Sequence, residues 1–143
     1  MVETAPGPID VLVIEFPEGS SGADSAAALG RLLDQGAVCL YDIVAVRRAA
    51  DGTVSELALD DPAAVTAYAA YGGARSGLLD QEDVAQAGAI LEPGTTALMV
   101  AYENAWARGF VTAAHAEGGR MIASERIPAQ VLMDALDAID GAG

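Results

Sequence analysis

Two glutamates, Glu15 and Glu103, stand near the ends of apolar stretches and are the first candidates for chemistry. Both stretches are typical of strands, so the two carboxylates meet only if the strands are neighbours whose ends coincide. Two apposed carboxylates raise the pKa of one of them, which suits acid–base catalysis or cation binding. The simpler interpretation is that both carboxylates lie in water at strand ends, or that Glu103 and Asn104 cap the helix that follows.

Aromatic residues close to these glutamates predict a second kind of site. A pocket between the sheet and the helices could bind a small ligand, as pockets in sandwiches of this kind do. The residues that we expect to line it are Glu15, Tyr41, Tyr102, Glu103 and Trp106.

Three residues are candidates for an interface between copies of the chain. Asp42 is a charge inside an apolar strand, and it either pairs with Arg47 or Arg48 of a neighbouring copy or lies on an exposed sheet face. Trp106 and Phe110 are one helical turn apart, a spacing typical of core or interface anchors. We therefore predict structural or interface roles for all three.

Other residue types exclude several classes of site. His115 is the only histidine, which rules out a histidine-dependent triad or a multi-histidine metal site within one chain. The glycine-rich stretch at 72–77, GGARSG, lacks the lysine and the strand-loop-helix frame of a phosphate-binding loop. Cys39 is the only cysteine, and its apolar surroundings predict a buried, inert thiol. We expect no catalytic residues, no metal and no cofactor.

The charge of the chain restricts its partners. It carries 21 acidic and 7 basic residues, a formal net charge of −14. This charge repels nucleic acids and anionic membrane surfaces. No stretch approaches the ~18 to 20 apolar residues of a membrane span, and the N-terminus lacks the features of a secretory signal. We expect a soluble cytoplasmic protein that binds neither nucleic acid nor membrane.

The elements that must position these residues follow from hydrophobic periodicity and turn signals. The stretch at 9–16 is apolar on both faces, which predicts a central strand, whereas the polar stretch at 119–126 predicts an edge strand. The predicted strands are 9–16, 37–48, 53–59, 95–103 and 119–126, and the predicted helices are 23–35, 63–71, 81–91, 104–117 and 128–139.

This order predicts an α+β protein. Its first part matches the β-α-β-β-α-β order of a ferredoxin-like sandwich, to which a C-terminal β-strand and helix are added. We expect a flexible leader at 1–8, a single domain at 9–140 and a frayed tail at 141–143.

Two blocks carry a resemblance to a known family. They are DIVAVRRAADGTV at 42–54 and LEPGTTALMVAYENAW at 91–106, followed by the glycine pair at 118–119. The chain resembles a bacterial family of unknown function related to general-stress-protein-like membrane proteins, in its soluble, acidic actinobacterial branch. Other members carry a long hydrophobic segment where this chain has only residues 71–77, so membrane insertion is not expected here. The resemblance implies no reaction, cofactor or catalytic residue.

The sequence thus favours a non-enzymatic, self-associating (homo-oligomeric) α+β module over an enzyme. The expected interface is the aromatic helix or an exposed sheet face. The alternative is a small-ligand-binding protein or enzyme with a pocket near Glu103 and Trp106.

Overall fold

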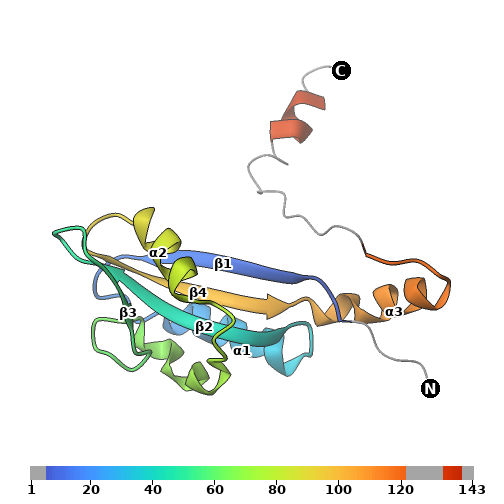
Figure 1. Ribbon diagram of the computed structural model, residues 1–143, viewed down its shortest axis with the longest axis horizontal. Coiled ribbons are helices and arrows are strands. Elements are labelled where there is room, and N and C mark those ends of the chain that lie inside the picture. The colour runs from blue at the N-terminus through green and yellow to red at the C-terminus, as the bar shows by residue number, and fades with distance from the viewer. Residues whose placement is uncertain (1–5, 122–133, 140–143) are drawn as a thin grey trace.

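The computed structural model describes residues 6–121 and 134–139. Within these residues the strands form one four-stranded antiparallel sheet in the order β1-β4-β2-β3, so the last strand lies between the first two (Figure 1). The strands are β1 (Ile9–Phe16), β2 (Cys39–Arg48), β3 (Val54–Leu57) and β4 (Thr95–Glu103).

Helices cover both faces of the sheet. One face packs against α1 (Ala23–Asp34) and the 3₁₀ helix η1 (Thr66–Ala74), and the other packs against α2 (Gln81–Ala89). Beyond the end of β4, the short η2 (Ala105–Ala107) leads into α3 (Arg108–Ala116), which continues past the sheet (Figure 1). Residues 134–139 are also helical.

Local sequence signals explain where several elements begin and end. The Asp80 carboxylate accepts the Asp83 N–H while the Asp83 carboxylate accepts the Asp80 N–H, a capping box that starts α2. After α1, Gly36 adopts a φ of 71°, a left-handed conformation that glycine tolerates best. At Gly52 the chain turns between β2 and β3, which pair antiparallel as predicted.

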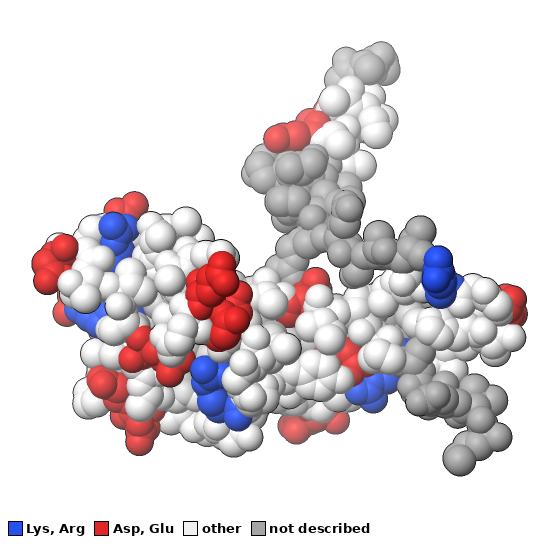
Figure 2. Space-filling view, viewed as in Figure 1, with Lys and Arg blue, Asp and Glu red and all other residues white. Residues whose placement is uncertain are grey.

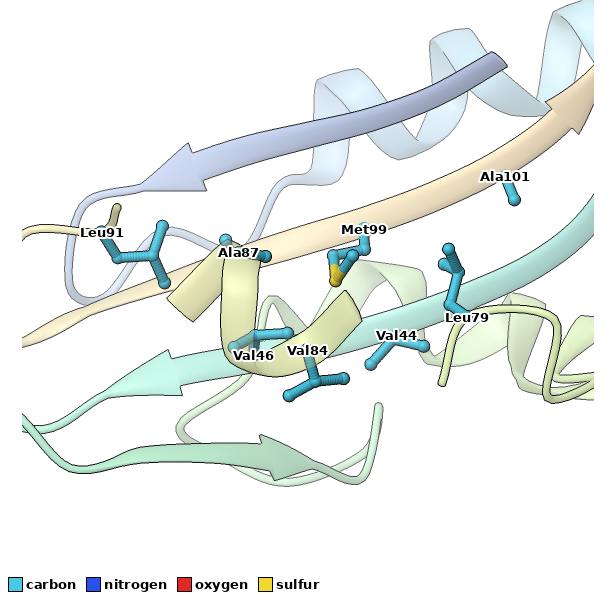
Figure 3. Packing of buried hydrophobic residues seen from close by; sticks show 9 residues of the cluster. Val44, Val46, Leu79, Val84, Ala87, Leu91, Met99 and Ala101 are labelled. Atoms are coloured by element: carbon cyan, nitrogen blue, oxygen red, sulfur yellow. The ribbon is translucent and has the colours of Figure 1, made fainter. Parts of the chain in front are cut away.

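The core has two parts, one on each face of the sheet. On the α2 face, alternate residues of β2 and β4 pack against α2 and the segments that flank it (Figure 3). The main members of this cluster are Val44, Val46, Leu79, Val84, Ala87, Leu91, Ala97, Met99 and Ala101. On the α1 face, the intervening residues Ile43, Leu98 and Val100 pack against Ala26, Val65 and Tyr68. Both odd-numbered and even-numbered positions of β2 and β4 therefore carry apolar residues because both faces of these strands are buried.

The α+β class is confirmed, whereas the ferredoxin-like arrangement is not. The elements follow the predicted β-α-β-β-α-β order as far as Glu103, apart from η1, and the observed strand order is β1-β4-β2-β3.

The prediction that β1 is a central strand was wrong. In the described part of the chain only β4 pairs with β1, and Ile9, Val11, Val13 and Ile14 are each 38% to 48% exposed. Apolar residues on both faces predicted burial that the structure does not provide.

Three other segments differ from the predictions. The helix predicted at 63–71 is the 3₁₀ helix at 66–74. Residues 119–121 are not in a strand, and the rest of the strand predicted at 119–126 lies outside the described residues, as does the start of the final helix. That helix is observed at 134–139.

Two glycines offer a test of the packing of α2 on β3. A Cβ on Gly88 would clash with Cγ1 of Val54, whose Cβ lies 3.0 Å away, whereas a Cβ on Gly109 in α3 would meet no atom within 4 Å. Overpacking costs about 1–3 kcal/mol and alanine gains up to about 1 kcal/mol of helix propensity. We predict that Gly88→Ala lowers the free energy of unfolding and that Gly109→Ala raises it, both measured by urea denaturation. Equal stabilisation by both variants would show that α2 does not pack this closely.

Candidate functional site

The Glu103 carboxylate is fully buried at the end of β4. Its Oε1 accepts hydrogen bonds from the Tyr41 hydroxyl and from Nη2 of Arg108, both at 2.6 Å. Its Oε2 accepts hydrogen bonds from Nε of Arg108 at 2.7 Å and from the Gly7 N–H at 2.6 Å. Arg108 thus binds the carboxylate through two parallel bonds, the geometry that makes such pairs strong.

An irregularity in β2 brings Tyr41 to this carboxylate. Cys39 pairs with Glu103 and Leu40 pairs with Tyr102, but the next pair is Asp42 with Ala101, so Tyr41 is an extra residue in β2. Such a bulge redirects side chains. Tyr41 therefore lies on the same sheet face as Glu103 and reaches it, and the regular alternation of inward and outward residues does not predict this.

The chain that precedes β1 closes the site. Gly7 is buried, and a Cβ at this position would clash with the backbone oxygen of Asn104. The Asn104 N–H donates to the Pro8 oxygen at 2.7 Å, and the Asn104 side chain bonds the same oxygen and Asp10. Asn104 therefore fastens the chain before β1 to the end of β4, and its side chain makes no cap bond to the helix that follows.

These contacts determine the ionisation of the site. The two hydrogen bonds from Arg108 are the main reason why the pKa of Glu103 falls to about 2, and the bonds from Tyr41 and Gly7 lower it further against the effect of burial. The same carboxylate raises the pKa of Arg108. The hydrogen bond to Glu103 is also the largest cause of the raised pKa of Tyr41. At neutral pH the site holds an ion pair and a neutral tyrosine.

This arrangement is suited to holding segments of the chain together and not to proton transfer. A general base needs a pKa near the working pH and a free lone pair, and Glu103 has a pKa of about 2 and four donors. The nearby Cys39 thiol is half-buried, and Nη2 of Arg108 lies 3.2 Å from its sulfur. The predicted N-cap or solvent role of Glu103 was wrong, because its carboxylate is buried and joins four segments of the chain.

A second buried carboxylate, that of Asp42, holds the loop before α2. It accepts hydrogen bonds from the Ser76 N–H at 3.0 Å and the Leu79 N–H at 2.7 Å, and it pairs with Nη1 of Arg75 at 2.6 Å. Burial raises the pKa of Asp42, but the bonds from Leu79, Ser76 and Arg75 together hold it below its usual value. The Ser76 amide of the glycine-rich stretch and the Leu79 amide that follows it thus bind an internal carboxylate.

The structure separates the other predicted site residues. Glu15 lies at the opposite end of β1 from Ile9, the partner of Glu103, and its carboxylate accepts the Glu92 N–H and the Thr95 hydroxyl. Tyr102 lies on the α1 face of the sheet. Of the residues of the predicted pocket, Tyr41 and Glu103 are joined by a hydrogen bond, whereas Tyr102 and Trp106 line a different groove.

An apolar groove lies on the α1 face. It has a volume of about 450 Å³ and runs between α1, β1 and β4. Leu12, Ile14, Leu32, Tyr102 and Trp106 are among its lining residues. Trp106 is 72% exposed and Phe110 is 80% exposed, so in the described structure neither is a core residue.

Sequence reasoning missed the two arginines that pair with the buried carboxylates. Arg108 follows Glu103 by five residues across the end of a strand, and Arg75 lies 33 residues from Asp42. A buried carboxylate needs a partner. Asp42, a charge in an apolar strand, signalled that need, but its partner is Arg75 of the same chain and the sequence does not identify it.

Among the residues that the structure describes, no group of three or more His, Cys, Asp or Glu side chains is placed to hold a metal ion. No helix within residues 6–121 or 134–139 is long and apolar enough to cross a membrane.

Comparison with known proteins places the chain in a family. A model of a family of unknown function, DUF6325, matches residues 5–141, which is almost the whole chain. The chain belongs to DUF6325. No curated protein and no solved structure matches it. The predicted relation to general-stress-protein-like membrane proteins is not shown by the DUF6325 match.

The low pKa of Glu103 predicts a pH-dependent contribution to stability. The carboxyl group titrates at about 2 when folded and near 4.5 when unfolded. Its contribution is therefore fully present above pH 4.5 and is lost as the pH falls toward 2. We predict that Glu103→Gln lowers the free energy of unfolding at pH 7 by about 1.5–3 kcal/mol, and that the gap to the wild type narrows below pH 4.5. A gap that is independent of pH in urea titrations would contradict this assignment.

The two carboxylates that bind Arg75 predict unequal effects. Asp42 is fully buried, whereas the Glu56 side chain is 34% exposed and lies 3.1 Å from Nη2 of Arg75. We expect Asp42→Asn to cost about 1.5–3 kcal/mol and to speed hydrogen exchange at the Ser76 and Leu79 amides. The matched variant Glu56→Gln should cost less than about 1 kcal/mol. Equal losses in the two variants would mean that Asp42 does not anchor the loop.

Proposed function

We propose that this DUF6325 protein acts as a self-associating module in which β1 of one copy pairs with β1 of a second copy. The observation that carries this proposal is the free edge of β1. This strand has eight residues, and in the described part of the chain no strand pairs with its outer edge. Long, apolar edge strands are templates for pairing with another chain unless charges, proline or a covering element block them.

The alternation of hydrogen bonds between β1 and β4 identifies the backbone groups that a partner strand would meet. Pro8 is opposite Asn104 and accepts its N–H, so the even-numbered residues of β1 bond to β4. The backbone groups of Ile9, Val11, Val13 and Glu15 consequently point away from β4. Along this edge, the N–H and C=O groups of four residues face away from β4, and no strand of the described residues pairs with them.

The side chains along this edge are suited to burial. Ile9, Val11, Val13 and Ile14 are exposed although they belong to a regular strand. The charged residues of β1 are Asp10 and Glu15, near its two ends. Burial of apolar surface at about 25 cal/mol per Å² would favour association. The net charge of −14, part of which is visible as separate acidic groups in Figure 2, opposes close contact over other areas.

Symmetry limits the register of such a dimer. With a two-fold axis perpendicular to the sheet, each face of the sheet continues across the dimer only if odd-numbered residues of one β1 lie opposite odd-numbered residues of the other β1. The two most central registers place Leu12 or Val13 on the axis. In neither register does Asp10 lie opposite Glu15, so no like charges are directly paired. The product is a continuous eight-stranded sheet.

This function is favoured over the small-ligand pocket near Glu103 and Trp106. The Glu103 carboxylate is engaged by groups of the same chain, while Trp106 lines the groove on the α1 face. The proposed interface at β1 also differs from the interface predicted from Asp42, Trp106 and Phe110.

A proline scan of β1 tests the proposal. Val11→Pro removes an N–H that points outward, so it should leave the fold intact and abolish dimerisation. Leu12→Pro removes an N–H that bonds to β4 and should instead destabilise the fold. We expect light scattering with size exclusion to give a dimer for the wild type and a folded monomer for Val11→Pro.

Ile90→Lys is a control for a loss of exposed apolar surface, because Ile90 is 77% exposed and lies at the end of α2. It should remain dimeric. A wild-type mass of 14.5 kDa at all concentrations, or a dimer in folded Val11→Pro, would exclude pairing through β1.

A further inference from the structure

The apolar groove on the α1 face is not fully covered by the described residues, and several of the side chains that line it are exposed. Leu32 is 43% exposed, Ile14 is 38% exposed and Trp106 is 72% exposed, and all three line it. Most of the lining is apolar, and no charged side chain contributes to it. A groove of this kind is suited to the apolar side of an amphipathic helix.

The C-terminal part of the chain carries such a helix. Residues 134–139 are helical, and Leu136 and Ile139 are 51% and 68% exposed. The apolar residues of the predicted helix at 128–139 recur at helical spacing and form one stripe: Val131, Leu132, Ala135, Leu136 and Ile139. The family match extends to residue 141, so this helix belongs to the region that the family shares.

We propose that the C-terminal helix, which the sequence predicts at 128–139, docks through this stripe into the groove between α1 and β1 of its own chain. The acidic residues Asp134 and Asp137 lie off the stripe, so the docked helix would keep both charges in water and bury none against the uncharged lining. Docking would bring the exposed apolar walls and the exposed apolar stripe into contact.

The length of the connection permits docking within one chain. Twelve residues, 122–133, separate Met121 from the described helix. At about 3.4 Å per residue such a segment can span up to about 40 Å, and it still spans about 20 Å if 128–133 are helical. The whole of β4, with nine residues, is about 30 Å long. Since Trp106 lies just beyond β4 and also lines the groove, the helix has to reach only the near end of this strand to begin docking.

Trp106 is the only tryptophan and therefore reports on the groove without labelling. In the wild type, docking predicts blue-shifted emission and weak quenching by acrylamide. The double variant Leu136→Asn/Ile139→Asn should shift the emission to the red and increase quenching. The matched variant Asp134→Asn/Asp137→Asn places the same residue type in the same helix, off the stripe, and should behave as the wild type.

Identical quenching of Trp106 in the wild type and in the Leu136→Asn/Ile139→Asn variant would overturn the proposal. The Val11→Pro background separates this result from self-association. If Trp106 stays shielded from acrylamide in the Val11→Pro variant and at high dilution, the result supports docking within one chain. Shielding that appears only in associated wild-type protein would contradict it, whether or not β1 forms the dimer interface.

Discussion

The bond between the Glu103 carboxylate and Arg108 is the interaction on which the arrangement of the sheet depends. A carboxylate buried without partners would be strongly destabilising, and here four donors from three other parts of the chain satisfy it. These donors belong to the chain before β1, to the bulge of β2 and to the start of α3. The Glu103 carboxylate thus links the end of β4 to the chain before β1, to β2 and to the start of α3.

With β4 held between β1 and β2, the two edges of the sheet differ. On one side, β3 is short and packs against α2 through Val54 and Gly88. On the other, β1 is long and has few contacts beyond β4, and the apolar groove lies beside it. The proposed pairing of β1 and the proposed docking of the C-terminal helix both concern this second side. Together they would cover the apolar residues of β1 that the described structure leaves exposed.

Much of the fold could be predicted from local patterns, since β1 and β4 have the predicted bounds and Asp80 caps α2 as expected. The position of β1 could not, because apolar residues on both faces indicate burial without saying what provides it. Only part of the candidate site could be predicted from the sequence. Glu103 and Tyr41 were candidates, but their contact depends on a bulge, and the partners Arg75 and Arg108 are chosen by tertiary packing.

Amide hydrogen exchange along β1, followed by NMR at a high and a low protein concentration, tests the pairing of β1 with a second copy most directly. Pairing of β1 with a second copy predicts that the outward amides of Val11 and Val13 are protected at high concentration, as the inward amides of Leu12 and Ile14 are. Fast exchange of Val11 and Val13 at every concentration, beside protected Leu12 and Ile14, would contradict it.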